Sequence, residues 1–222
     1  MNIAFVPARC GSKSIRFKNI KEFCGKPLIY WSLLTLQNSK VVDEVYVATD
    51  CEDISKVVES FEFPKVNIYM RDKQNAQDES STEAVMLEFL QKHSFDDYDM
   101  FLLVQATSPT TISKDIDDAM AKLKEEKKDS LLSVVREKKF FWDDDGKPIN
   151  YDFRSRPRRQ DFNGILLENG AFYINKVGNV IRDKNRLSGE ISFYELDDYN
   201  NIDIDEHIDW QIAESYMQEY VL

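Results

Sequence analysis

The sequence predicts an α/β protein built on a three-layer, mostly parallel, doubly wound sheet. As far as about residue 137, short apolar runs alternate with segments whose apolar residues recur at helical spacing. This β-α-β-α order is typical of a parallel sheet with helices on both faces. From about residue 138 the rhythm changes to an aromatic and charged segment, which predicts a small β-rich insertion.

The first strand-helix pairs are the most regular. NIAFVPA, at residues 2–8, is an almost unbroken apolar run, typical of a strand buried on both faces. Residues 27–39 carry apolar side chains at helical spacing, and Pro27 suits the first turn because its missing amide hydrogen needs no partner there. DEVYVATD at 43–50 predicts the second strand, and EDISKVVESF at 52–61 predicts the second helix.

Later elements continue the alternation and then close the fold. KVNIYM predicts a third strand at residues 65–70, and TEAVMLEFLQKH predicts a helix at 82–93 that Ser80 or Ser81 would cap. Further strands are expected at residues 99–106, 129–136, 168–175 and 190–196, and further helices at 113–127 and from about Glu206.

The length of 222 residues suits a single domain with one insertion. We expect residues 1–222 to form that domain and the insertion to occupy about residues 138–168. Asp145 and Gly146 predict a hairpin turn within it.

The charge of the chain is both negative and uneven. A formal net charge of −11 argues against a nucleic-acid-binding protein, because such proteins need a basic surface to displace counterions from phosphates. Six basic residues and one acidic residue lie within residues 1–27, whereas residues 190–222 hold ten acidic residues and no Lys or Arg. These segments could form two halves of one site, the first for an anion and the second for a cation.

The cysteine pattern and the hydropathy indicate a cytoplasmic protein. Cys10, Cys24 and Cys51 have no C-x-x-C spacing, and we expect them to be free thiols. The apolar run at the N-terminus is too short for a signal peptide, and no run approaches the length of a membrane span.

The loop after the first strand has the composition of a phosphate-binding loop. In PARCGSKSIRFKN, Gly11 permits close backbone approach, successive amides can form an anion nest, and Lys13 and Lys18 can bind phosphate oxygens. Ligands of parallel sheets bind beyond the carboxyl ends of the strands, and the loops PARCGSK, TD, RDKQ and QATSP all lie there.

The same stretch resembles the ARxGSKxxxxKN signature of the CMP-sialic acid synthetase family, the cytidylyltransferases that activate nonulosonic acids. KPLIYWSL continues the resemblance, and LLVQATSP, RPRRQDF, ENGAFYIN and IDIDEHIDWQIAE follow in the family's order. The match spans residue 3 to about residue 216, and five motifs in register make it specific. Within it, Cys10 stands where many members have Gly, and Leu167 stands where some bacterial members have Arg.

The resemblance implies a Rossmann-like nucleotidyltransferase fold and transfer of CMP from CTP to the anomeric 2-hydroxyl of a sialic-acid-like nonulosonic acid, with release of pyrophosphate. It also implies a homodimer, in which the insertion contributes to the interface and completes the sugar site. Position by position, it implies that the CTP phosphates are held by Arg9, Ser12, Lys13, Lys18 and Asn19, the cytosine by Arg71, Ser81 and Thr82, and the sugar by Gln105, Arg158, Arg159, Gln160 and Asn169.

Asp203 and Asp205 are the expected ligands of Mg²⁺. Residues at i and i+2 of an extended segment point to the same side, so both carboxylates could share one ion that also binds phosphate oxygens. Acidic residues also stabilise the N-terminal turn of a helix, so a purely structural role fits as well. We expect Lys18, Arg9 and Asp205 to act directly on the reacting phosphates, because nucleotidyl transfer depends on positioning and on charge neutralisation.

Three alternatives remain open on the residues. The same reaction could act on the eight-carbon acid Kdo, or DID could be the D-x-D motif of a metal-dependent glycosyltransferase. A nucleotide-binding module without catalysis is the third, although it would not need both the basic loop and the carboxylate pair. RPRRQ could also form a nucleic-acid patch, but bidentate recognition of a sugar carboxylate explains its arginines better.

Overall fold

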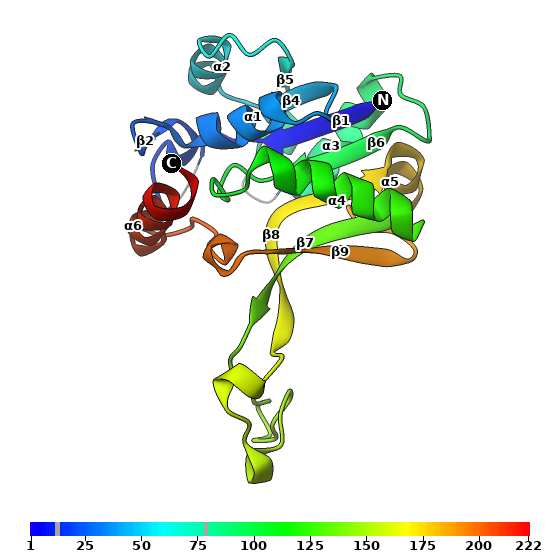
Figure 1. Cartoon of the computed structure of the whole chain (residues 1–222). Coiled ribbons are helices and arrows are strands. Elements are labelled where there is room, and N and C mark those ends of the chain that lie inside the picture. Colours follow the sequence, from blue (N-terminus) through cyan, green and yellow to red (C-terminus); the bar gives the residue numbers. More distant parts are fainter. Residues whose placement is uncertain (12–13, 78–79) are drawn as a thin grey trace.

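A computed structural model describes residues 1–11, 14–77 and 80–222 and shows the predicted three-layer α/β architecture (Figure 1). Its centre is a seven-stranded sheet with the order β5-β4-β1-β6-β8-β7-β9. Only β8 runs against its neighbours, because the pairings β1–β4, β1–β6, β4–β5 and β7–β9 are parallel. The strands are β1 (Asn2–Pro7), β4 (Glu44–Thr49), β5 (Val66–Met70), β6 (Met100–Val104), β7 (Ser130–Glu137), β8 (Ile165–Lys176) and β9 (Ile191–Leu196).

The helices follow the predicted order with one addition, α5, which the sequence analysis missed. A two-stranded hairpin also lies between β1 and the first helix, and short 3₁₀ turns are scattered through the loops. The helices are α1 (Leu28–Asn38), α2 (Glu52–Glu59), α3 (Thr82–Lys92), α4 (Ser113–Glu126), α5 (Val177–Asp183) and α6 (His207–Tyr216), continued by the π-helical turn η6 (Met217–Val221). The hairpin consists of β2 (Glu22–Phe23) and β3 (Lys26–Pro27), and the 3₁₀ turns are η1 (Lys18–Ile20), η2 (Lys73–Asn75), η3 (Phe153–Ser155), η4 (Arg159–Asp161) and η5 (Asp198–Asn200).

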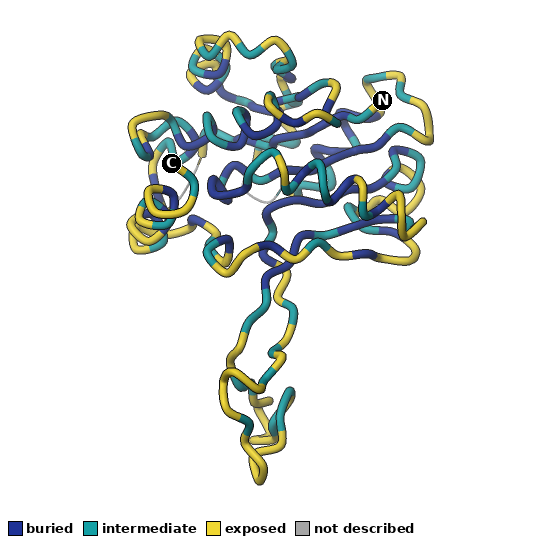
Figure 2. Tube along the Cα trace, viewed as in Figure 1, coloured by how far each residue is buried: buried dark blue, intermediate teal, exposed yellow. Residues whose placement is uncertain are grey.

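Alternation along β1 divides the core into two layers. Ala4 and Val6 pack with α1, α2 and α4 on one face of the sheet. Ile3 and Phe5 point to the opposite face and pack with α3 and α5. Because both faces are covered, the central strands are dark blue in the burial view (Figure 2), which explains their unbroken apolar sequences.

A third apolar cluster attaches the C-terminal helix to the edge of the sheet. Trp210 of α6 packs edge-on against Phe23 at 5.4 Å between ring centroids, and Leu28 and Ile204 complete the contact. This cluster places the segment before α6 beside the loop after β1.

The segment between β7 and β8 projects from the body as a long arm, residues 138–164 (Figure 1). The expected β-rich character holds at its base, where β7 and β8 pair, but regular pairing within the described arm is reduced to one bridge between Trp142 and Pro148. Phe140 packs against Tyr151 and Phe162, while Trp142 and Phe153 remain about half exposed. The arm has too little core of its own to bury its aromatic residues.

The loop after β5 is held by the buried carboxylate of Glu88 in α3. Its oxygens accept hydrogen bonds from the Tyr69 hydroxyl at 2.5 Å, the Asp72 amide at 2.8 Å and the Asn75 side chain at 2.6 Å. Burial alone would raise the pKa of Glu88, but these bonds outweigh it and hold the pKa below its ordinary value. The network fixes the chain on both sides of Arg71.

No helix in the part of the chain that the structure describes is long and apolar enough to cross a membrane.

Phe89→Ala should lower the free energy of unfolding by about 3–5 kcal/mol, because Phe89 is fully buried and the loss of its ring leaves a cavity. Its ring lies 5.1 Å from that of Phe5 and 4.8 Å from that of Tyr46. Urea denaturation measures the change. Tyr98→Ala, at a side chain that is 82% exposed, is the control and should shift stability by less than about 0.5 kcal/mol.

Glu88→Gln should lower the free energy of unfolding at pH 7 by about 1–3 kcal/mol. Because the pKa of Glu88 is lower in the folded state, its contribution is complete above the unfolded value of about 4.3 and is lost as the pH falls through the folded value. The difference between wild type and variant should therefore shrink on acidification. An equal difference at pH 7 and at pH 3 in urea titrations would contradict this, and Glu125→Gln serves as the exposed control.

Candidate functional site

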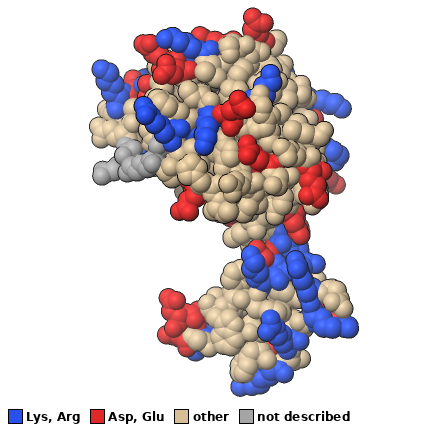
Figure 3. All heavy atoms as spheres, turned by 90° about the vertical axis from the view of Figure 1, so that its left-hand side faces the viewer, with Lys and Arg blue, Asp and Glu red and all other residues tan. Residues whose placement is uncertain are grey.

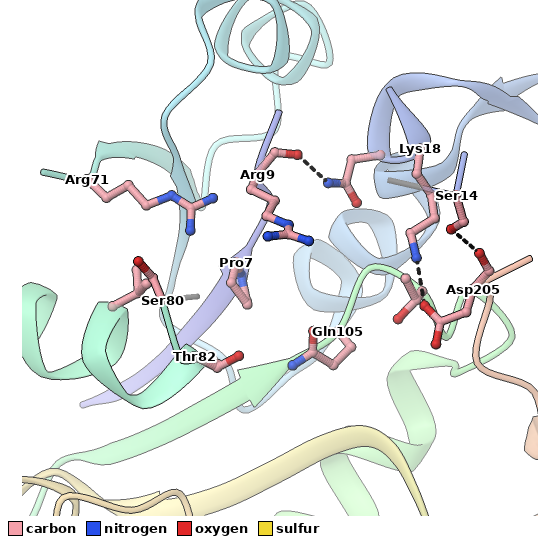
Figure 4. Close-up of a pocket in the computed structure, with 12 residues that line it drawn as sticks. Pro7, Arg9, Ser14, Lys18, Arg71, Ser80, Thr82, Gln105 and Asp205 are labelled. Atoms are coloured by element: carbon pink, nitrogen blue, oxygen red, sulfur yellow. Dashed lines mark hydrogen bonds and ion pairs between the residues drawn. The ribbon is translucent and has the colours of Figure 1, made fainter. Parts of the chain in front are cut away.

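A cavity of about 430 Å³ opens at the carboxyl edge of the sheet. Loops after β1, β5 and β6 reach it, as expected for a parallel sheet. In the close-up (Figure 4), the side chains of Arg9, Lys18, Arg71 and Gln105 surround one common space. The lining consists of Pro7, Arg9, Ser14, Lys18, Asn19, Arg71, Ser80, Thr82, Val85, Gln105, Thr107 and Asp205.

The ammonium of Lys18 connects the two oppositely charged segments of the chain. Its Nζ donates to the Ile204 carbonyl at 2.5 Å and to Oδ1 of Asp205 at 3.1 Å. The Lys18 side chain is only 12% exposed, whereas that of Asp205 is 74% exposed. Ser14 adds a hydrogen bond from its hydroxyl to the Asp205 carbonyl. The Asp205 carboxylate is thus held beside the Lys18 ammonium and stays open to solvent.

The side chain of Asn19 stabilises the loop that follows β1. It is largely buried, and its Nδ2 donates to the Arg9 carbonyl at 3.2 Å. The bond joins the turn η1 to Arg9, whose side chain lines the cavity (Figure 4).

Arg71 forms the other charged wall of the cavity. Its side chain is 5% exposed, and a guanidinium nitrogen lies 3.2 Å from Oδ1 of Asp50. Burial lowers the pKa of Arg71, and the charge of Asp50 opposes that shift. Its Nε is buried and has no hydrogen-bond partner in the described ranges of the chain. An acceptor atom of a bound molecule would satisfy this donor.

The expectation of three free thiols is wrong for two of them. Cys10 and Cys51 form a disulfide with 5.3 Å between their Cα atoms, and Cys24 is free. Cys10 follows β1 and Cys51 follows β4, so neighbouring parallel strands bring them together although they lie 41 residues apart. The Cys10 amide also donates to Asp50 at 3.1 Å, which couples this bridge to the partner of Arg71.

Most of the nucleotide residues predicted from sequence meet in this cavity. Arg9, Lys18, Asn19, Arg71 and Thr82 all line it, together with Asp205, which was predicted as a metal ligand, whereas Ser12 and Lys13 lie outside the described residues. Ser81 does not line it, because its Oγ accepts from the Ala84 amide at 3.1 Å and caps α3. Ser80 lines the cavity in its place. The choice between adjacent serines depends on where the helix begins, which the sequence left open.

The predicted sugar residues are distributed over three places. Gln105 lines the first cavity, and Asn169 lines a second one that also contains Asp203. Arg158, Arg159 and Gln160 lie in the arm, whose basic side chains gather below the body in Figure 3. Arg158 pairs with Asp161 within the arm at 2.8 Å.

Asp205 lines the first cavity and Asp203 lines the second, and the two carboxylates are close enough for the charge of Asp205 to act on Asp203. The pKa of Asp203 is raised, chiefly by desolvation and also by the charges of Asp205 and Asp209, although Thr107 and Lys18 oppose the shift. Within residues 1–11, 14–77 and 80–222, no three His, Cys, Asp or Glu side chains gather closely enough to hold a metal by themselves. Two carboxylates with phosphate oxygens and water are nevertheless a usual donor set for Mg²⁺, so the pair fits an ion that binds together with a nucleotide.

Comparisons with known proteins agree with this geometry. The chain is 36% identical to N-acylneuraminate cytidylyltransferase A of Danio rerio, over 95% of this chain and 49% of that protein. It is 31% identical to the pseudaminic acid cytidylyltransferase of Campylobacter jejuni, over 78% of this chain and 77% of that protein. The chain spans about half the length of the first curated relatives that it matches.

The fold and the family are shown by two further matches. A solved structure of CMP:2-keto-3-deoxy-manno-octonic acid synthetase complexed with CTP superimposes with a TM-score of 0.71 at 17% identity, covering 98% of both chains. The family model described as cytidylyltransferase matches residues 3–220. The chain therefore belongs to the cytidylyltransferase family.

Proposed function

We propose that the protein transfers CMP from CTP to the anomeric 2-hydroxyl of a sialic-acid-like nonulosonic acid, with Mg²⁺ and with release of pyrophosphate. The observation that carries the proposal is the cavity that brings together Arg9 and Lys18, after β1, and Asp205, before α6, with Lys18 and Asp205 in direct contact. The names of the N-acylneuraminate and pseudaminic acid relatives support the reaction and the substrate class.

The charges of the cavity suit a nucleoside triphosphate. Arg9 and Lys18 offer cationic donors beside the loop that precedes η1, where the triphosphate would lie. Arg71 occupies the other wall, and its buried, unpaired Nε would donate to an acceptor of the cytosine ring. Ser80 and Thr82, at the start of α3, would complete the nucleobase end.

The residues of the chain would act on the reaction by position and charge. Lys18 is held by the Ile204 carbonyl and by Asp205, so its ammonium is already oriented before substrate binds. Together with Arg9 it would neutralise charge that develops on the α-phosphate and on the departing pyrophosphate. The backbone amide of Gln105 donates to the Ala171 carbonyl at 2.9 Å, and its side chain lines the cavity, where it would orient the attacking sugar.

Asp203 and Asp205 would hold Mg²⁺ together with phosphate oxygens. When bound, the ion supplies a Lewis acid that stabilises negative charge and favours ionisation of a coordinated hydroxyl. The pKa of Asp203 is raised chiefly by burial and secondarily by the charges of Asp205 and Asp209, and a bound cation would oppose both effects.

We also propose a homodimer in which the arm covers the sugar site of the partner subunit. Trp142, Ile149 and Phe153 are each about half exposed on the arm, and such a cluster is typical of an interaction surface. Arg158 and Arg159 line neither cavity of their own chain. A partner's arm could bring equivalent arginines to the carboxylate of the sugar acid.

The reaction is tested by pyrophosphate release from CTP and Mg²⁺ with N-acetylneuraminate or Kdo. Wild type should release pyrophosphate with N-acetylneuraminate. Lys18→Ala and Asp205→Asn should each reduce kcat by about 100-fold or more, since the first removes a cation that neutralises phosphate charge and the second removes a charged ligand of Mg²⁺. Lys56→Ala, at an exposed lysine in α2, should behave as wild type. If neither acid leads to pyrophosphate release, the proposal is refuted, and release with Kdo alone would select the eight-carbon substrate.

Sharing of sites between subunits predicts complementation. Lys18→Ala carries a defective cavity with an intact arm, and Arg159→Ala carries an intact cavity with a defective arm. A mixed dimer then contains one intact composite site, so unfolding and refolding an equimolar mixture should restore about a quarter of wild-type activity. Sedimentation velocity should show a dimer. Mixed dimers that form without any gain over the separate variants would exclude a shared site.

A further inference from the structure

A second cavity of about 360 Å³ lies beside Asp203, and its wall carries the exposed carboxylate of Glu168, which has no role in the proposed reaction. One wall is the beginning of β8, with Glu168, Asn169 and Tyr173, and the other is the segment before α6, with Asn201 and Asp203. It adjoins the first cavity, because β8 lies beside β6, whose last residue, Val104, pairs with Phe172 of β8 and precedes Gln105.

A β-bulge shapes the wall formed by β8. Leu132 of β7 pairs with Tyr173 and Val134 pairs with Glu168, so four residues of β8 stand opposite Ser133 alone. The hydroxyl of Ser133 donates to the Asn169 side chain at 2.7 Å and accepts from the Phe172 amide at 3.0 Å. Bulges of this kind re-aim side chains next to functional sites. Here the bulge brings Glu168 and Tyr173 together, and the Tyr173 hydroxyl donates to Oε1 of Glu168.

The other polar groups of this cavity are already engaged. Asn169 accepts from Ser133 and donates to the Asn200 carbonyl at 3.0 Å, so its amide is tied into the fold. The Asn201 side chain donates to Glu137 at 3.2 Å. In contrast, Oε2 of the exposed Glu168 has no hydrogen bond within the described parts of the chain. Glu168 therefore offers a charged acceptor to whatever enters the cavity.

Buried groups hold this acceptor in place. Tyr173 is 4% exposed, and burial, with the Glu168 carboxylate second, raises its pKa to about 12, so the hydroxyl remains a donor at neutral pH. The guanidinium of Arg186 lies 4.9 Å from the centroid of the Tyr173 ring. Arg186 also pairs with Glu83 at 2.6 Å, and Glu83 follows Thr82 of the first cavity. An exposed carboxylate with such support is preorganised rather than free to rotate.

We infer that Glu168 is a specificity-determining residue that accepts a hydrogen bond from a hydroxyl or acylamino N–H group of the sugar acid. Its charge, together with that of Asp203, turns the carboxylate of the substrate away from this wall. Tyr173 is the positioning residue that aims Glu168. The inference rests on the proposed function. It narrows the substrates to sugar acids in which the hydroxyl or N–H that faces Glu168 carries no substituent that prevents it from donating a hydrogen bond.

The test measures KM for N-acetylneuraminate and for CTP separately in the full chain. Glu168→Ala should raise KM for the sugar acid about tenfold or more, because it removes a charged acceptor, and leave KM for CTP within about twofold. Glu168→Gln keeps an acceptor oxygen and should have a smaller effect in the same direction, as should Tyr173→Phe. Glu125→Gln, an exposed control in α4, should change neither constant.

A panel of singly O-methylated N-acetylneuraminates and an analogue N-methylated at the acylamino group then identifies the donor. For the analogue that lacks it, Glu168→Ala should cause no further rise in KM, as in a double-mutant cycle. A folded, active Glu168→Ala variant with unchanged KM for every sugar acid would overturn the inference. Failure of wild type to release pyrophosphate would instead overturn the proposed function. If Glu168→Ala does not fold by circular dichroism, the comparison between Glu168→Gln and wild type decides.

Discussion

The contact between Lys18 and the segment before α6 is the interaction on which the arrangement of the site depends. A largely buried ammonium needs acceptors, and it finds them in the Ile204 carbonyl and the Asp205 carboxylate. The apolar cluster around Phe23, Ile204 and Trp210 supports the same junction. Basic residues near one end of the chain and acidic residues near the other thereby become two sides of one cavity.

The reversed direction of β8 determines what else reaches this edge. Since β8 runs antiparallel to β6 and β7, its first residues lie where those two strands end. The arm leaves β7 and enters β8 at that edge, and the bulge at Glu168–Tyr173 lies there as well. One strand reversal therefore places the arm, the second cavity and Gln105 on the same side of the molecule. An all-parallel sheet would have put the start of β8 at the opposite edge.

Two cavities flank the Asp203–Asp205 segment, and the division matches the two substrates of the proposed reaction. The first is cationic, with Arg9, Lys18 and Arg71. The second carries Glu168 and Asp203, which favour hydrogen-bond donors. Between them, the carboxylates of Asp203 and Asp205 would hold the proposed Mg²⁺. In the proposed reaction, a polyanionic nucleotide and a hydroxyl-rich sugar acid would thus be separated by electrostatics as well as by shape.

Local patterns in the sequence determined the strands, the main helices, the basic loop and Asp205, because these follow from periodicity and from residue chemistry within a few positions. Only the tertiary structure decided the pairing of Cys10 with Cys51, which of Ser80 and Ser81 lines the first cavity, and the position of Glu168. Each depends on strand order, on the first residue of a helix or on a bulge. These features arise from contacts between segments far apart in the chain, and no local pattern encodes them.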